Sequence, residues 1–337
     1  MGKRILIITD AWNQMNGVVT TFENTIRELK NMGHEVKLIT PDDFKTVPLP
    51  TYKEIKVAIN PWKVSKLIEE AAADYIHVAT EGPIGLFATN YLRKRSWAFT
   101  TSYHTKMPEY VNERFPFVSK KLVYRYMKHI HKKSKSVLVT TESMKRELLH
   151  AGFENDMIVW GRGVDTSIFN PEGRNDDPHT PCWLYVGRIS PEKNLEALLD
   201  MKIIGVKRIV GDGPLLNHYK EKYKDNPYII FEGAKRGKEL QQAYVNADVF
   251  VFPSKTDTFG IVMLEAMACG TPVAAFPVTG PKDCVDEGVT GCLNDDLYWA
   301  VATCLDLDRE KIAAVGLTKT WENCTQIFAN SLVNKWD

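Results

Sequence analysis

The fold can be inferred from residues 249–275, VFVFPSKTDTFGIVMLEAMACGTPVAA. The stretch opens with a four-residue apolar run, breaks at Pro253, and crosses a polar loop to Phe259-Gly260. A run rich in Leu, Met and Ala follows and stops at Gly270, before Pro272 and a second apolar run. This order predicts a buried strand, a loop, a helix and a second strand, which together are typical of an open α/β sheet.

The polar loop of this stretch has the features of a binding site. A loop that enters a helix at the carboxyl end of a buried strand can hold an anion, because unpaired N–H groups and the helix dipole point at the ligand. Gly260 allows the backbone to approach such a ligand closely. Asp257 and Glu265 bracket the loop with seven residues between them. These residues predict a site for phosphate and hydroxyl groups.

Length and composition indicate a two-domain, soluble, cytoplasmic protein. A chain of 337 residues exceeds the size at which one hydrophobic core stops growing. Its 44% hydrophobic and 25% charged residues are ordinary for a globular protein. The six cysteines include no C-x-x-C pair, which favours thiols in a reducing compartment. The apolar run near the N-terminus is too short for a secretory signal, and no run reaches the length of a membrane span.

The net charge of +1 conceals an asymmetry between the two halves of the chain. Residues 1–170 carry 25 Lys and Arg against 18 Asp and Glu, and the basic excess peaks between Lys120 and Lys135. Apolar residues are interleaved there, so the expected helix could contact an anionic membrane surface or attract an anionic acceptor. The simpler alternative is a solvated helix face with its apolar side packed inward. Nothing else in the sequence supports nucleic-acid binding. A peripheral position on the inner face of a membrane is therefore one expectation.

The first half of the chain opens like a Rossmann-type unit. Residues 3–10 predict a buried strand, residues 16–18 a loop that contains Gly17, residues 21–32 a helix and residues 36–40 a second strand. The G-x-G-x-x-G fingerprint is absent, so a dinucleotide site is unsupported. Further strands are expected at residues 75–79, 98–103 and 137–140. Residues 171–181 are rich in Pro, Gly, Asn and Asp, and we expect the domain boundary there.

The second half contains two more loops at predicted strand ends. Arg188 and Lys193 follow the expected strand at residues 183–186, and a guanidinium with an ammonium suits a diphosphate. Gly211 and Gly213 follow the strand at residues 206–210 and permit close backbone approach to a base or ribose. Residues 306–308 read D-x-D, a pattern associated with metal binding, but they are expected in a surface helix. No metal site is predicted.

Five motifs in this order resemble those of a known family. The string from Asp257 to Val273 is similar to the E-x7-E signature of retaining, nucleotide-sugar-dependent glycosyltransferases of the family 4 type, with Asp257 in place of the first Glu. The other four are S-Y-H-T-x-x-P-x-Y from Ser102, G-V-D-x-x-x-F-x-P from Gly163, G-R-x-x-x-E-K-N from Gly187 and G-x-G-P from Gly211. An Asp carboxylate reaches less far than a Glu carboxylate, which puts the identity of the donor sugar in question.

The resemblance implies the GT-B fold: two Rossmann-like domains that face each other across a cleft. The expected divisions are residues 1–170 for the acceptor-side domain and residues 171–317 for the nucleotide-sugar-binding domain. Residues 318–337 are expected to form an amphipathic helix that packs back on the N-terminal domain.

The resemblance also implies roles for individual residues. Arg188 and Lys193 would hold the donor phosphates, Asp257 the sugar, and Glu265 the ribose, whereas His104 would orient a sugar hydroxyl or act near the leaving group. Backbone approach to the donor is implied for Gly17, Gly187, Gly211, Gly213, Phe259, Gly260 and Ile261. Glu81 and Tyr110 are expected to line the acceptor pocket.

The implied reaction is the transfer of a hexose from a UDP- or GDP-linked donor to a hydroxyl of a lipid or saccharide, with retention of anomeric configuration. The two cations would take the role of a metal, so no metal cofactor is expected. An alternative from a different class is a nucleotide-sugar-binding protein with weakened or lost transfer activity, which the Asp at position 257 suggests. A related epimerase or phosphorylase is a weaker alternative.

Overall fold

The computed structural model describes residues 2–12, 17–49, 52–114, 117–175, 180–257 and 259–337. The chain folds into two compact units. The first consists of Met1–Gly161 together with Trp321–Asp337, and the second consists of Arg162–Thr320. The division lies earlier in the chain than the boundary expected at residue 170. The reason is that Val164 forms a β-bridge with Thr320, and Phe169 is buried in the core of the second unit.

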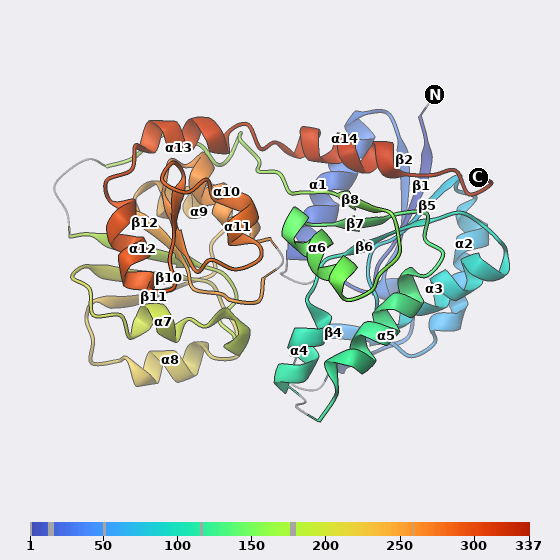
Figure 1. The fold of residues 1–337 in the computed structure, drawn as a ribbon, viewed down its shortest axis with the longest axis horizontal. Coiled ribbons are helices and arrows are strands. Elements are labelled where there is room, and N and C mark those ends of the chain that lie inside the picture. Colours follow the sequence, from blue (N-terminus) through green and yellow to red (C-terminus); the bar gives the residue numbers. More distant parts are fainter. Residues whose placement is uncertain (1, 13–16, 50–51, 115–116, 176–179, 258) are drawn as a thin grey trace. The chain divides into compact units, whose positions relative to one another are not determined.

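The first unit is built on a parallel sheet with the strand order β2-β1-β5-β6-β7-β8 (Figure 1). Its inner strands are continuous buried runs, as a sheet covered by helices on both faces requires. The predicted strands are present, with boundaries that shift by one or two residues. The strands are β1 (Arg4–Ile8), β2 (Glu35–Ile39), β5 (Tyr75–Val78), β6 (Thr100–Tyr103), β7 (Val137–Val139) and β8 (Met157–Val159).

Helices connect these strands, and one hairpin was not predicted. The helices are α1 (Gly17–Asn31), α2 (Val64–Ala71), α3 (Pro83–Lys94), α4 (Met107–Arg114), α5 (Lys120–His131) and α6 (Glu142–His150). An antiparallel hairpin of β3 (Thr46–Leu49) and β4 (Tyr52–Ala58) lies between β2 and α2. Gly17 is the first described residue of α1, and its carbonyl accepts a hydrogen bond from Thr21 Oγ1 at 2.6 Å. The expectation that Gly17 lies in a loop is therefore wrong.

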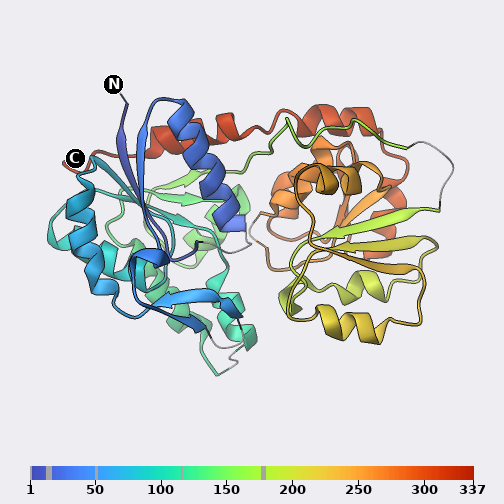
Figure 2. The same ribbon diagram turned by 180° about the vertical axis from the view of Figure 1, so that it is seen from behind.

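The C-terminal segment returns to the first unit, as the resemblance predicted (Figure 2). Helix α14 (Trp321–Ser331) packs beside α1. Its Phe328 is fully buried, with ring centroids 6.3 Å from Phe22 and 4.8 Å from Trp160. Asn334 then forms a bridge with Tyr75 at the start of β5. Residues more than 200 positions apart in sequence thus share one core.

The second unit repeats the architecture with a parallel sheet of order β11-β10-β9-β12-β13-β14. Its strands are β9 (Cys182–Val186), β10 (Val206–Val210), β11 (Ile229–Gly233), β12 (Val249–Phe252), β13 (Val273–Ala275) and β14 (Gly291–Leu293). Its helices are α7 (Glu196–Leu199), α8 (Leu216–Lys222), α9 (Gly237–Val245), α10 (Ile261–Ala268), α11 (Pro281–Cys284), α12 (Leu297–Cys304) and α13 (Arg309–Gly316). Separate hydrophobic clusters contain alternate residues of β9 and β12, which places one cluster on each face of the sheet.

The D-x-D sequence at residues 306–308 lies between two helices. Helix α12 ends at Cys304, and the Asp308 carboxylate accepts hydrogen bonds from the backbone N–H groups of Glu310 at 3.0 Å and Lys311 at 3.3 Å. Asp308 is thus the N-cap of α13. The prediction that this sequence lies within a surface helix is wrong, because an Asp before a helical run satisfies that helix's first N–H groups.

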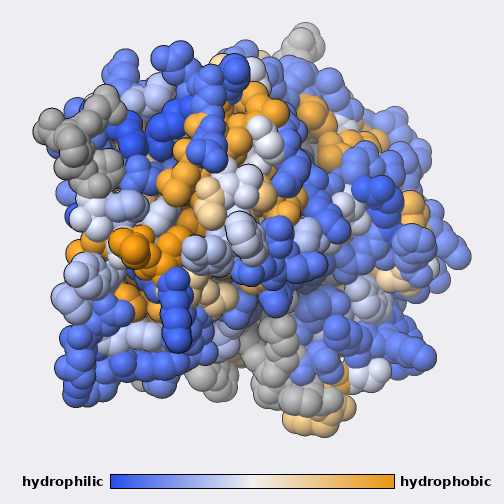
Figure 3. All heavy atoms as spheres, turned by 60° about the vertical axis from the view of Figure 1, so that its left-hand side comes forward, coloured by the Kyte–Doolittle hydropathy of each residue, from blue (hydrophilic) through white to orange (hydrophobic). Residues whose placement is uncertain are grey.

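The surface is mainly hydrophilic, with hydrophobic residues gathered in patches on the face that Figure 3 shows. Exposed large apolar side chains include Trp299 at 60% in the second unit and Phe117 at 85% in the first. Within the part of the chain that the structure describes, no helix combines the length and apolar character needed to cross a bilayer.

Candidate active site

The residues predicted to bind the donor come together at one edge of the second sheet. Arg188 and Lys193 follow β9, Gly211 and Gly213 follow β10, and Asp257 follows β12. These strands are parallel neighbours. The carboxyl ends of parallel strands meet at the same edge of a sheet, so the three loops adjoin one another.

An ion pair joins two of these loops. Lys193 Nζ lies 2.6 Å from Asp257 Oδ1 and 2.8 Å from Oδ2, so one ammonium binds both oxygens of the carboxylate. The two side chains are only 21% and 16% exposed. Partial shielding from water strengthens the attraction compared with a surface pair. Lys193, predicted to bind the phosphates, and Asp257, predicted to bind the sugar, are therefore in direct contact.

Side-chain to backbone bonds hold these loops in place. Asn194 has a left-handed backbone with φ of 50°, and its Nδ2 donates to Pro253 O at 3.0 Å. Thr256 Oγ1 and Ser254 Oγ both donate to the carbonyl of Glu192, at 3.3 and 3.4 Å. Because three bonds connect the segments on either side of the ion pair, its position is determined by the loops themselves.

The loop after β10 packs closely against the loop after β9. Ile189 N donates to Asp212 O at 2.9 Å, and Tyr185 Oη donates to Arg188 O at 2.7 Å. A Cβ at Gly211 would lie 1.9 Å from Gly187 O, and Gly211 has a φ of 143°. Only glycine can occupy this position, because any side chain would overlap a backbone carbonyl.

The third loop enters α10 through Gly260, which has a φ of 92°. A Cβ there would lie 2.9 Å from Met263 Cε and 3.0 Å from Phe252 Cζ. Phe259, just before it, lies under the guanidinium of Arg162, 5.9 Å from the ring centroid. Ile261 is the first residue of α10, so the N-terminus of this helix adjoins the loop; that it binds an anion stays a prediction. Thr258 lies outside the described residues.

Glu265 is partly buried on α10. Tyr244 Oη, from the end of α9, donates to Glu265 Oε2 at 2.9 Å. Burial raises the pKa of the Glu265 carboxyl to about 7, and the Tyr244 bond opposes that rise. Near neutral pH this carboxyl is therefore poised between its protonated and ionised forms. Sequence reasoning found Glu265 but missed Tyr244, because no local pattern links residues on two different helices.

In the first unit, the structure places His104 directly after β6 and almost fully buried. Its Nε2 lies 2.7 Å from Ser102 Oγ. Edge contacts with Phe22 and Trp160, at centroid distances of 5.4 and 5.7 Å, enclose the ring. His104 thus has one defined position at the carboxyl edge of the first sheet.

Glu81 lies in the interior of the first unit. Its Oε1 is 3.3 Å from Nε2 of His131 on α5, and both side chains are at most 4% exposed. Tyr126 Oη also donates to the carbonyl of Glu81, at 2.8 Å. Tyr110 belongs to α4, and its side chain lies outside the described part of the structure. A role for Glu81 or Tyr110 at the acceptor stays a prediction.

Asp10 is a structurally important residue that sequence reasoning did not select. It follows β1, and its carboxylate accepts hydrogen bonds from Ile84 N at 2.7 Å, Gly85 N at 3.0 Å and Thr80 Oγ1 at 3.0 Å. It therefore caps α3 from a distant part of the chain. Burial raises its pKa to about 6, whereas these donors act in the opposite direction. The only sequence signal was an Asp two positions after the apolar run of residues 5–8.

Replacing Asp10 with Ala should lower the free energy of unfolding by about 2 kcal/mol, because two N–H groups at the start of α3 lose their acceptor. Urea unfolding of the whole chain measures this change. Glu70→Ala is a matched control, since its carboxylate is exposed and pairs with Lys66 Nζ of the same helix at 3.5 Å. Equal stability of the two variants would contradict the capping role.

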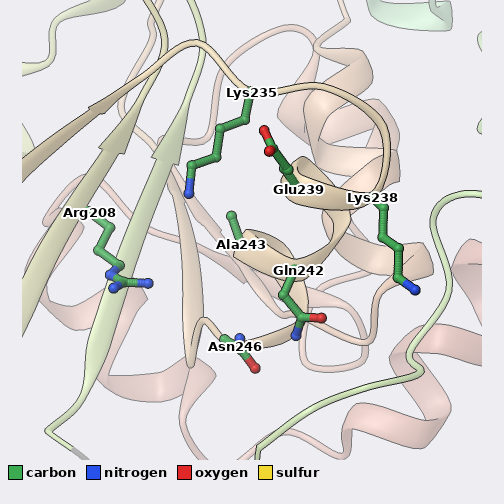
Figure 4. A pocket seen from close by; sticks show the side chains of 7 residues that line it. All are labelled: Arg208, Lys235, Lys238, Glu239, Gln242, Ala243 and Asn246. Atoms are coloured by element: carbon green, nitrogen blue, oxygen red, sulfur yellow. The ribbon is translucent and has the colours of Figure 1, made fainter.

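A cavity of about 540 Å³ lies beside α9 (Figure 4), and its lining includes none of the residues predicted to bind the donor. Arg208 and Lys235 both pair with the carboxylate of Glu232, the former at 3.0 Å from its Nε. The positive charges of Arg208 and Lys235 in this cavity are thus partly neutralised by the Glu232 carboxylate. The lining residues are Arg208, Lys235, Lys238, Glu239, Gln242, Ala243 and Asn246.

The fold and the edge-of-sheet site define a class: proteins of the GT-B fold. Among solved structures, sucrose-phosphate synthase from Thermosynechococcus elongatus has the same fold, since it superimposes over 97% of this chain and 99% of its own with a TM-score of 0.74. Sequence identity is 21%, so this likeness concerns the fold alone. The predicted fold class is thereby confirmed.

The chain belongs to the family 4 glycosyltransferases. The sequence model of the family described as "Glycosyltransferase Family 4" matches residues 15–168. The model described as "Glycosyl transferases group 1" matches residues 180–306. The predicted family is confirmed.

Three curated relatives show how this chain compares with characterised sequences. It is 33% identical to sulfoquinovosyl transferase SQD2 of Arabidopsis thaliana, over 83% of this chain and 61% of that protein. It is 26% identical to a GDP-mannose-dependent alpha-mannosyltransferase of Mycobacterium tuberculosis, over 87% and 84% of the two chains. It is also 26% identical to alpha-monoglucosyldiacylglycerol synthase of Streptococcus pneumoniae, over 86% and 75%. The chain thus spans about three fifths of the plant relative's length.

Proposed function

We propose that this protein transfers a hexose from a nucleotide-diphosphate sugar to a hydroxyl of a lipid or saccharide. The contact of Lys193 with Asp257 carries the proposal. It brings a phosphate-binding cation and a hydroxyl-binding carboxylate together at the carboxyl edge of a parallel sheet, where α/β proteins bind nucleotides. The relatives named for mannosyl, glucosyl and sulfoquinovosyl transfer support a sugar donor.

In this proposal, the second unit binds the donor. Arg188 and Lys193 bind the diphosphate, and their charges stabilise the negative charge that develops on it as the sugar leaves. Asp257 and the N–H groups of Phe259 and Gly260 hold the sugar, while Glu265 accepts hydrogen bonds from the ribose. The acceptor attacks from the face that the nucleotide leaves, so the configuration is retained. Catalysis comes from positioning and electrostatic stabilisation.

The acceptor side is proposed for the first unit, with a lipid acceptor favoured. The apolar residues of α5 divide between two surfaces: Val123, Met127 and Ile130 are buried, whereas Leu122 is 50% and Tyr126 38% exposed. The exposed pair lies among basic residues of the same helix, the composition of a helix that contacts an anionic membrane. We propose that α5 brings the protein to the cytoplasmic face of a membrane.

Thermal unfolding with added nucleotides tests the donor site. UDP, GDP, ADP and their hexose conjugates are compared at 100 times the dissociation constant, where binding stabilises the fold by about 2.7 kcal/mol, a shift of a few degrees. We expect one base to raise the melting temperature equally with and without Mg²⁺. If no nucleotide at millimolar concentration shifts it, the donor-site proposal is refuted.

A further inference from the structure

Arg162 is an almost fully buried arginine at the start of the second unit, with only 7% of its surface exposed. It comes directly before the G-V-D motif, for which the proposed reaction has no role. Its guanidinium carbon lies 5.9 Å from the ring centroid of Phe259, in the loop between β12 and α10. Burying a guanidinium costs free energy unless it finds partners, and the face of an aromatic ring is one such partner. The contact connects the first residue of the unit to the loop proposed to hold the sugar.

The chain next to Arg162 is firmly anchored in the second unit. Val164 N donates to Lys319 O at 2.8 Å, and Val164 forms a parallel β-bridge with Thr320. The Val164 side chain is 2% exposed and belongs to the hydrophobic core of this unit. One residue separates Val164 from Arg162, so the guanidinium is presented by a segment that is itself held in place.

Phe259 is restrained at its backbone as well as at its ring. Its carbonyl accepts a weak hydrogen bond from Cys284 Sγ at 3.8 Å. Gly280 has a φ of 96°, and a Cβ there would lie 3.0 Å from Phe259 O and 3.3 Å from Phe259 N. The ring packs against the core of the second unit and lies under the guanidinium of Arg162. Different elements thus hold the two parts of this residue.

The orientation of Phe259 determines where two backbone N–H groups point. Among the residues that the structure describes, the N–H groups of Phe259 and Gly260 donate to no acceptor in the protein. In the proposed reaction both groups bind the sugar of the donor. The peptide units on either side of Phe259 are planar and are joined only through its φ and ψ, so a rotation of this residue would turn one or both N–H groups away.

We propose that Arg162 is a positioning residue: by holding the Phe259 ring, it keeps the N–H groups of Phe259 and Gly260 directed at the sugar of the donor. This inference rests on the proposed sugar transfer. In that reaction the diphosphate and the ribose are bound by Arg188, Lys193 and Glu265, none of which depends on the Phe259 ring. Arg162 therefore supports recognition of the sugar and not of the nucleotide.

The test compares the affinities of a nucleoside diphosphate and of its sugar conjugate by calorimetric titration of the full-length protein. The probes are UDP with UDP-glucose and GDP with GDP-mannose, and the pair that the wild type binds is used for the variants. Arg162→Met removes the guanidinium and keeps an unbranched side chain. We expect it to bind the nucleotide sugar about tenfold more weakly, the effect of losing one buried cation–π contact, and the free diphosphate as tightly as wild type. Arg162→Lys keeps a cation and should retain most of the affinity.

Arg174→Met is the matched control. Arg174 is a partly buried arginine of the same unit, but its guanidinium binds two backbone carbonyls at the end of α9 and the carboxylate of Asp248. Its loss should lower stability and leave the ratio of the two affinities unchanged. Phe259→Leu is a second variant, because it removes the ring. The double variant with Arg162→Met should bind the nucleotide sugar no more weakly than Phe259→Leu alone, since the two side chains act through one contact.

Backbone ¹⁵N relaxation of the ligand-free protein measures the restraint itself. We expect order parameters near about 0.85 for Phe259 and Gly260 in wild type and in Arg174→Met, falling toward about 0.6 in Arg162→Met.

The proposal is overturned if Arg162→Met weakens both ligands equally or neither, or if it leaves these order parameters unchanged. The relaxation data need no ligand, so they give a result even if the protein binds no nucleotide sugar. A protein with the expected order parameters that bound none of the four probes would refute the proposed function, while the restraint of the loop by Arg162 would stand.

Discussion

Replacing Lys193 with Ala should lower kcat for sugar transfer by about a hundredfold to a thousandfold, the effect of removing one group that stabilises charge in a transition state. The Lys193 ammonium contacts both oxygens of Asp257 and is partly shielded from water. In the proposed reaction, this cation and Arg188 together compensate the negative charge that develops on the departing diphosphate. Initial rates with saturating nucleotide sugar give kcat directly.

Two further variants distinguish the role of the Lys193 ammonium in the reaction from the effect of its positive charge alone and from a loss of protein stability. Lys193→Arg keeps a cation and should retain part of the activity, because its guanidinium can also bind both oxygens of Asp257 but is larger and planar where the ammonium is compact. Lys222→Ala is the matched control, since Lys222 forms an equally short ion pair with Glu196, 2.6 Å, on the exposed helix α8. If Lys193→Ala keeps kcat within about threefold of wild type, the proposed role of Lys193 is wrong.

Replacing Glu265 with Ala should weaken nucleotide-sugar binding by about a hundredfold, because hydrogen bonds to a carboxylate are among the strongest in proteins. Removing the carboxylate also leaves Tyr244 Oη without the acceptor it has at 2.9 Å. Tyr244→Phe removes only that supporting bond, so its effect on affinity should be much smaller. Calorimetric titration of wild type and both variants measures these affinities.

The same carboxyl predicts a pH dependence of donor binding. Burial raises the pKa of Glu265 to about 7 in the free protein, and ribose hydroxyls donate best to the ionised form. Affinity should therefore fall as the pH falls, to about one tenth at pH 6 of its value at pH 8. A nucleotide sugar is the right probe, since its diphosphate does not titrate in this range. Glu265→Gln should abolish the dependence, and an unchanged slope in that variant would assign the titration to another group.

Local patterns predicted much of the fold. Apolar runs such as residues 5–8 and 249–252 form buried strands because a parallel sheet covered on both faces needs continuous apolar residues. Loop residues that must lie at the carboxyl ends of those strands, including Arg188, Lys193 and Asp257, could be named for the same reason. The donor side of the candidate site was therefore predictable as a set of loops.

Local patterns were misleading where a residue's partner is distant in sequence. Asp308 caps a helix instead of lying inside one, and the segment around Val164 belongs to the second unit because it pairs with Thr320. Asp10 caps a helix that begins more than 70 residues later. No periodicity contains such information, since each contact depends on which strand becomes the neighbour of which.

By itself, then, the sequence determined the family, the two parallel sheets and the loops that carry the predicted donor ligands, because period, glycine placement and motif spacing are local properties. Only the tertiary structure showed that Lys193 holds Asp257, that Tyr244 supports Glu265, and that His77 reaches His104 through Ser102. These are hydrogen bonds between elements that strand order and helix packing bring together. Their protonation depends on burial, which exists only once the chain has folded.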